Sequence, residues 1–130
     1  MSGCPQTANR QQELLAAAAD GDLSTGAAPT FTDETAVLVV AASEGYPLAP
    51  RTGDVIEGTE AAAAIAGVTV IGAGVGRNPA EQLVTAGGRV LNLIGTAADP
   101  ATARERAYQA TSAISWPGEH HRTDIAAPTT

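Results

Sequence analysis

The glycine-rich stretch at residues 70–77, VIGAGVGR, limits the folds open to this chain more than any other feature. A short apolar run followed at once by glycines is typical of a dinucleotide-binding turn. That turn needs the pattern G-x-G-x-x-G, and it must open a helix whose N-terminus meets the pyrophosphate. Here Arg77 occupies the third glycine position, and no crossover helix fits between Pro79 and the pair Gly87-Gly88. The glycines therefore need another structural reason.

The basic residues exclude several chemistries. All seven are arginine, so the chain has no lysine for a Schiff base, a P-loop, or the attachment of biotin or lipoate. The net charge of −7 repels phosphate backbones, so we expect no nucleic-acid partner.

Length and composition predict one domain with a core of its own. The chain has 130 residues, of which only 3% are aromatic, so valine, isoleucine, leucine and alanine must fill the core. The single cysteine, Cys4, cannot form an internal disulfide. No stretch approaches the about 18 apolar residues of a membrane helix, and no signal-peptide pattern opens the sequence. We expect a soluble, cytoplasmic protein with no membrane partner.

The apolar periodicity predicts an α+β fold: a small, mostly antiparallel sheet with an N-terminal and a C-terminal helix. Residues 10–19 favour helix, and the continuous apolar run 35–42 predicts a buried strand. Further β-rich segments lie at 68–74, 81–88 and 89–95, and turn residues at 77–79 and 87–88 separate them. This spacing is typical of a hairpin or meander.

The sequence predicts both where the C-terminal helix begins and which of its faces is buried. Asp99 is a good N-cap and Pro100 suits the first helical position, so a helix is predicted from there to Ser115. Its small apolar residues recur at helical spacing, at Ala103, Ala107, Ala110 and Ile114. This spacing predicts one buried face.

The histidines do not form a convincing metal site. Glu119, His120, His121 and Asp124 are close in sequence, but zinc usually takes spaced ligands on a stiff element. Adjacent side chains on an extended segment point in opposite directions. We therefore predict a solvated tail, no metal and no catalytic residue in this chain.

Two loops are candidates for binding. Residues 43–47, Ser43, Glu44, Gly45, Tyr46 and Pro47, follow a buried strand directly, where loops often carry function. Gly87 and Gly88 precede Arg89, and glycines that admit a ligand to the backbone suit an arginine that binds phosphate. The alternative is that Gly87-Gly88 form a hairpin turn and Arg89 is a solubilising residue at a strand edge.

Four segments, in this order and spacing, resemble the C-terminal domain of phosphoribosylamine–glycine ligase, also called glycinamide ribonucleotide synthetase. They are residues 37–58, 82–95, 103–118 and 121–126. The resemblance implies a domain of the rudiment single hybrid motif type. It divides the chain into a remnant or disordered segment at 1–9, a helix and loop leading in at 10–34, the domain itself at 35–126 and a tail at 127–130.

The resembled family is an ATP-grasp ligase of purine biosynthesis. It activates glycine with ATP and Mg²⁺ and joins it to 5-phosphoribosylamine. The resemblance implies that Arg89, with Gly87 and Gly88, holds the ribose 5′-phosphate, and that residues 43–47 form an interdomain or active-site loop. The family's His-Ala-Gly-Thr stretch is replaced here by residues 72–75, Gly-Ala-Gly-Val, and Arg77 is a weaker candidate for the basic residue beyond it.

The ATP-grasp and N-terminal domains of that family have no counterpart in these 130 residues. We therefore expect the chain alone to be inactive, to bind no cofactor, to bind a sugar phosphate only weakly, and to need the ATP-grasp portion in cis or in trans. The alternative is a non-catalytic interaction module or a degenerate relic that docks on a separate ATP-grasp partner.

Overall fold

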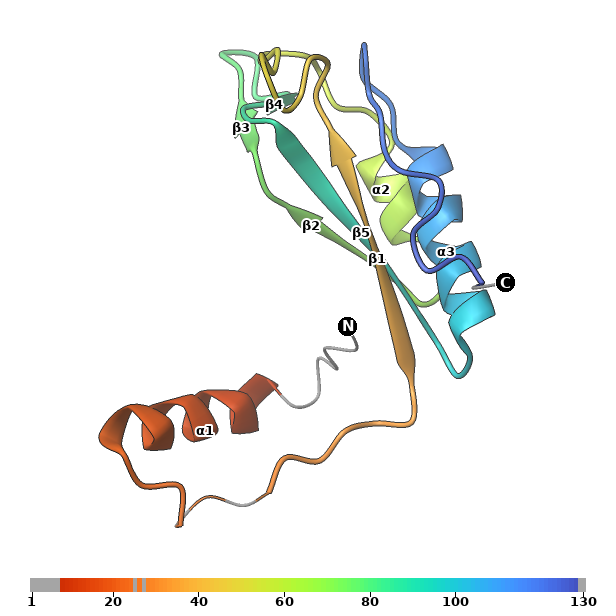
Figure 1. Cartoon of the computed structure of the whole chain (residues 1–130). Helices are drawn as coiled ribbons and strands as arrows, with labels where there is room; N and C mark the ends of the chain where they lie inside the picture. Colours follow the sequence, from red (N-terminus) through yellow and green to blue (C-terminus); the bar gives the residue numbers. More distant parts are fainter. Residues whose placement is uncertain (1–7, 25, 27, 129–130) are drawn as a thin grey trace.

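The computed structural model describes residues 8–24, 26 and 28–128, so Cys4 and most of the predicted segment 1–9 lie outside the described residues. In chain order the elements are α1 (Ala8–Asp20), β1 (Thr35–Ala42), α2 (Thr59–Ala63), β2 (Val68–Gly72), β3 (Val75–Arg77), β4 (Leu83–Thr85), β5 (Arg89–Ala97) and α3 (Pro100–Ala113). Figure 1 shows their arrangement. The predicted α+β class is confirmed.

The main sheet has the order β1-β5-β2, with both outer strands antiparallel to β5. In its middle row Val39 pairs with Leu93, which pairs with Val70. The continuous apolar run of β1 was correctly predicted as a strand. Val37, Val39 and Ala41 are buried on one face, whereas Leu38 on the other is 44% exposed.

Helices α2 and α3 cover one face of this sheet (Figure 1). Ala103, Ala107 and Ala110 of α3 are fully buried, as their spacing predicted. The carboxylate of Asp99 accepts a hydrogen bond of 2.9 Å from the Thr102 N–H, which confirms the predicted cap. The helix ends at Ala113, before the predicted Ser115, because Ser115 exchanges backbone hydrogen bonds with Glu57.

Of the two predicted turns, the one at residues 77–79 lies in a hairpin, whereas the one at residues 87–88 does not. Strands β3 and β4 pair with each other, and the loop between them is closed by Asn78, whose side-chain oxygen accepts from the N–H groups of Ala80 and Gln82 at 3.0 Å each. Strand β4 does not pair with β5. The alternative in which Gly87-Gly88 form a hairpin turn and Arg89 lies at a strand edge is therefore wrong, because β5 is the central strand of the main sheet.

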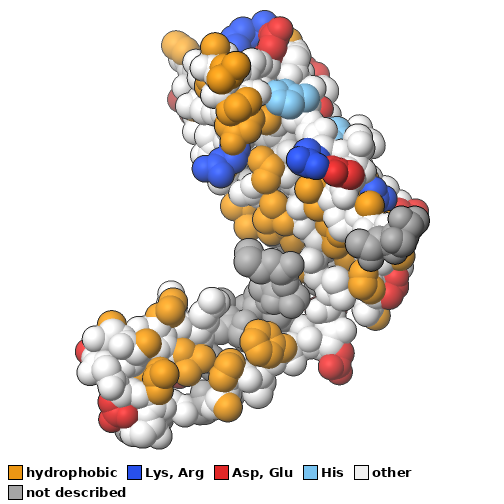
Figure 2. All heavy atoms as spheres, viewed as in Figure 1, with side chains coloured by type: hydrophobic (Ala, Val, Ile, Leu, Met, Phe, Trp, Pro, Cys, Tyr) orange, Lys and Arg blue, Asp and Glu red, His pale blue; other side chains and the backbone are white. Residues whose placement is uncertain are grey.

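The other face of the main sheet is open and is called here the open face. It consists of the outward residues of the three strands: Ala36, Leu38, Val40, Thr69, Ile71, Asn92, Ile94 and Thr96. None of these eight side chains is buried, and Ile71 is 47% exposed. Figure 2 shows hydrophobic side chains gathered in the hollow between the sheet and α1, with basic and histidine side chains at its upper end.

Helix α1 lies apart from the sheet (Figure 1). It covers the predicted residues 10–19 and is followed by Gly21 at φ 79°. Leu15 is 64% exposed, and no α1 side chain whose exposure the structure describes is buried. Within the described residues no helix combines the length and the apolarity needed to cross a membrane.

Candidate functional site

The two candidate loops lie against each other. The Ser43 N–H donates to the Gly88 carbonyl at 2.8 Å, and the Ser43 hydroxyl donates to the Gly87 carbonyl at 2.6 Å. The Tyr46 ring packs on Gly88 so closely that a Cβ atom there would overlap the ring. Contacts across more than 40 residues of sequence thus fix the loop after β1 to the segment that leads into β5.

The segment that leads into β5 also explains why residue 74, within the glycine-rich stretch 70–77, is a glycine. The Gly74 N–H donates to the Arg89 carbonyl at 2.8 Å, and the Ala86 N–H donates to the Gly74 carbonyl at 2.8 Å. A Cβ atom at Gly74 would lie 2.7 Å from the Arg89 oxygen and 2.8 Å from the Gly87 Cα atom. Two backbones therefore cross in contact at Gly74, and glycine serves this approach rather than a nucleotide turn.

Arg89 begins β5 and faces a cavity of about 390 Å³, called here the Arg89 pocket. The pairing of β1 with β5 shifts register between Ala41 and Ala42, so Arg89 stands opposite Ala42. Besides apolar residues, the pocket is lined by Tyr46, Arg89, His120, His121 and Arg122. Among the described residues no carboxylate pairs with Arg89, and its side chain is exposed.

The segment that carries the histidines is not the predicted solvated tail. His120 exchanges backbone hydrogen bonds with Ala42, and the guanidinium of Arg104 donates to the carbonyls of Thr123 and Ile125 at 2.7 and 2.9 Å. The Tyr108 hydroxyl donates to the Arg122 carbonyl at 2.7 Å and accepts from the Ile125 N–H at 3.1 Å. These bonds hold both histidines at the Arg89 pocket.

Two of the basic side chains that line the pocket have carboxylate partners. Arg122 binds Asp124 through two nitrogens at 2.8 and 2.6 Å, and these hydrogen bonds lower the pKa of Asp124 from its ordinary value. The His121 Nδ1 lies 2.9 Å from the Glu119 carboxylate. Both carboxylates are thus engaged locally, and no group of three potential metal ligands exists within the described residues.

Other candidate residues lie outside the Arg89 pocket. The Arg77 guanidinium donates to the Glu81 carbonyl at 2.6 Å, at the end of the β3–β4 hairpin. Glu44 forms an ion pair with Arg51, and the Gly45 carbonyl accepts from the Ala49 N–H at 2.8 Å. From residues 43–47 only Tyr46 and Pro47 line the pocket. The sequence did not predict that His120 and Arg122 line a pocket with Arg89, because no local pattern links residues that are more than 30 positions apart.

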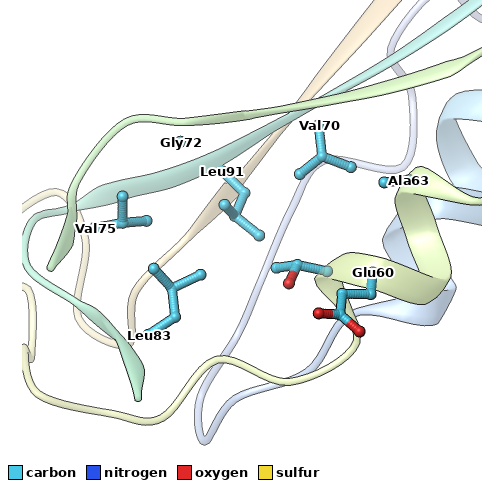
Figure 3. Close-up of a pocket in the computed structure, with 8 residues that line it drawn as sticks. Glu60, Ala63, Val70, Gly72, Val75, Leu83 and Leu91 are labelled. Atoms are coloured by element: carbon cyan, nitrogen blue, oxygen red, sulfur yellow. The ribbon is translucent and has the colours of Figure 1, made fainter. Parts of the chain in front are cut away.

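A second cavity of about 420 Å³ lies between α2 and the strands (Figure 3). Val70, Val75, Leu83 and Leu91 point into it, and among the described residues that line it only Glu60 is charged. An apolar cavity with one carboxylate does not suit an anion, whereas the Arg89 pocket does.

Fold and site together define a small α+β domain with a pocket lined by arginine and histidine side chains at one end of an open sheet face. The chain matches the family model described as "Phosphoribosylglycinamide synthetase, C domain" over residues 36–128, and it belongs to this family.

Named relatives agree with this assignment. A phosphoribosylamine–glycine ligase of Streptomyces coelicolor is 47% identical over 116 residues, which cover 88% of this chain and 28% of that protein. One of Leifsonia xyli is 44% identical over 124 residues, covering 95% and 30%. The crystal structure of phosphoribosylamine–glycine ligase from Thermotoga maritima superposes with a TM-score of 0.71 at 30% identity, covering 89% of this chain and 27% of that one. The chain therefore spans less than a third of the length of these relatives.

Proposed function

We propose that this domain forms the sugar-phosphate end of a phosphoribosylamine–glycine ligase site, in the reaction that joins glycine to 5-phosphoribosylamine with ATP hydrolysis in purine biosynthesis. The observation that carries the proposal is Arg89, an exposed guanidinium with no carboxylate partner among the described residues, which lines a pocket of about 390 Å³. The chain has a net charge of −7, so an arginine side chain that no described carboxylate neutralises stands out as a group for binding an anion. Its planar fork matches the geometry of a phosphate.

The surroundings of Arg89 support this role. Ser43 holds the carbonyls of Gly87 and Gly88, so the backbone just before Arg89 is fixed. A fixed backbone loses little conformational freedom when its side chain binds a ligand. The residues of this domain would bind and orient the phosphate end of the substrate. The reacting amine, at the other end of the substrate, would lie further from this domain.

The described residues do not fit ATP with magnesium. Mg²⁺ is held by carboxylates together with substrate phosphates, and no group of three potential ligands exists in this part of the chain. We assign nucleotide and metal binding, and with them glycine activation, to the remainder of the ligase. On this proposal the 130 residues alone do not form glycinamide ribonucleotide.

The open face is the surface we assign to that remainder, whether it is continuous with this chain or a separate chain. Leu38 and Ile71 are 44% and 47% exposed there, and the face runs into the Arg89 pocket through Val40. The relatives are more than three times as long as the matched region, so a large body of protein must meet this domain. Docking on the open face would give the pocket its second wall.

NMR titration with ribose 5-phosphate tests the phosphate role. We expect weak binding, on the order of millimolar, because one wall is missing. Shifts should cluster at residues 85–90 and disappear in Arg89→Ala. Arg77→Ala is the matched control, since Arg77 is also exposed but lies outside the pocket. Shifts that survive Arg89→Ala unchanged would refute the assignment.

A further inference from the structure

The Arg89 pocket is lined by basic side chains on both sides of Ala42. Ala42 is the antiparallel partner of Arg89 on β5 and also of His120 on the other side. Directly paired residues of antiparallel strands project from the same face. Arg89 and His120 therefore flank the small Ala42 side chain, about 10 Å apart at their backbones, which is twice the strand spacing. Both side chains line the same pocket.

The position of His120 is fixed by its backbone. The Ala42 N–H donates to the His120 carbonyl at 2.9 Å, and the His120 N–H donates to the Ala42 carbonyl at 3.2 Å. The imidazole remains available: its Nδ1 has only a 3.4 Å contact with the Gly118 carbonyl, and its Nε2 has no hydrogen-bond partner among the described residues. The side chain is exposed.

The neighbouring charges single out His120. Arg122 is neutralised by Asp124, and His121 lies against Glu119. On the loop after β1, Glu44 is engaged by Arg51, and Tyr46 is the remaining titratable residue that faces the pocket. The charged residue of β5 that faces the pocket is Arg89 itself. Of the four basic side chains that line the pocket, Arg89 and His120 are thus the two without a carboxylate partner among the described residues.

We propose that His120 is the second phosphate-binding group of this pocket, and that it clamps the dianion against Arg89 in its protonated form. The proposal rests on the phosphate role of Arg89. A dianion bound between the two side chains favours the protonated imidazole, because an opposite charge nearby stabilises the charged form. Binding therefore takes up a proton, and anion affinity rises as pH falls through the titration range of histidine.

Sulfate is the probe for the pH dependence, because it stays a dianion between pH 6 and pH 8 whereas a phosphate ester titrates there. NMR titrations of the whole chain at both pH values should give several-fold tighter sulfate binding at the lower pH. His120→Gln should bind equally weakly at both. Arg77→Ala, at an exposed arginine outside the pocket, should keep the wild-type dependence. The His120 ring signals should also show a higher pKa with ribose 5-phosphate than without it.

The outcomes separate this inference from the proposed function. If ribose 5-phosphate binding needs Arg89 but is unchanged in His120→Gln, the phosphate role stands and the His120 clamp is wrong. If binding is independent of Arg89, the phosphate role itself fails and the clamp with it. Equal sulfate affinity at both pH values in the wild-type chain, or no shifts at His120 and residues 85–90 up to tens of millimolar, also overturns the clamp.

Discussion

The Ser43 hydroxyl donates a hydrogen bond of 2.6 Å to the Gly87 carbonyl, which joins the end of β1 to the segment before β5. Ser43 is fully buried, and its N–H binds the next carbonyl, that of Gly88. One residue thus satisfies two consecutive carbonyls just before Arg89. The pocket depends on this junction.

Ser43→Ala should lower stability by about 1 kcal/mol or somewhat more, because it removes a part-buried hydrogen bond. It should also weaken ribose 5-phosphate binding without removing Arg89. Ser112→Ala is the control, since the Ser112 hydroxyl makes an exposed hydrogen bond of 3.0 Å on α3. Urea unfolding measures the difference. Equal stability of the two variants would show that the Ser43 bond contributes little.

Gly88→Ala should displace the Tyr46 ring, because the added Cβ atom would overlap it. We expect lower stability together with loss of ribose 5-phosphate shifts, since Tyr46 lines the Arg89 pocket. Gly76→Ala is the matched control: its added Cβ would meet only the Ala86 Cβ, at 3.4 Å. Thermal unfolding and NMR report both effects. Wild-type binding by Gly88→Ala would contradict the packing described here.

Asp99 should make α3 sensitive to acid. The hydrogen bond from the Thr102 N–H lowers the pKa of the Asp99 carboxyl from its ordinary value. A depressed pKa stabilises the fold above the unfolded value of about 3.9, and this stabilisation is lost as pH falls through the folded value. Asp99→Ala should be less stable than wild type at pH 7, whereas Asp99→Asn keeps a capping oxygen and should remain close to it.

Thermal unfolding between pH 2 and pH 7 checks the cap. The stability difference between wild type and Asp99→Ala should shrink toward the acid end. Asp99→Asn should lack the part of the pH dependence that belongs to this carboxyl. A difference between wild type and Asp99→Ala that stays constant with pH would mean that the Asp99 charge is not involved.

Tyr108→Phe should loosen the segment that carries the histidines. The Tyr108 hydroxyl binds both the Arg122 carbonyl and the Ile125 N–H, so its loss should cost about 1 kcal/mol. The Ile125 amide should exchange faster with solvent. Tyr46→Phe removes a hydroxyl that has no hydrogen bond in the described part of the chain, and it should leave that amide protected. Unchanged exchange at Ile125 in Tyr108→Phe would count against this anchor.

The open face should make the isolated chain self-associate. Ile71→Lys places a charge on that face and should shift sedimentation toward monomer. Leu48→Lys is the control, because Leu48 is 95% exposed and lies in the loop after β1. If a ligase core is supplied, Ile71→Lys should also weaken its binding. A wild-type chain that stays monomeric and binds no ligase core would oppose the docking assignment.

The sequence by itself determined the elements whose signals are local. The cap at Asp99 and the alanine spacing define α3 because both act within a few residues of the chain. The apolar run 35–42 predicted β1 because a continuous apolar run of strand length bounded by turn residues favours a buried strand. In the structure only one face of this strand is buried. The resemblance to the ligase family rested on residues that could be quoted in order.

Only the tertiary structure decided which strands pair and which side chains meet. Gly87-Gly88 look like a hairpin turn, yet β4 pairs with β3, because pairing depends on register and on packing across the sheet rather than on two turn residues. His120 and Arg89 line one pocket because both pair with Ala42. No local pattern encodes that arrangement: the three residues come from distant parts of the chain, and the free energy that joins them comes from burying the sheet against α3.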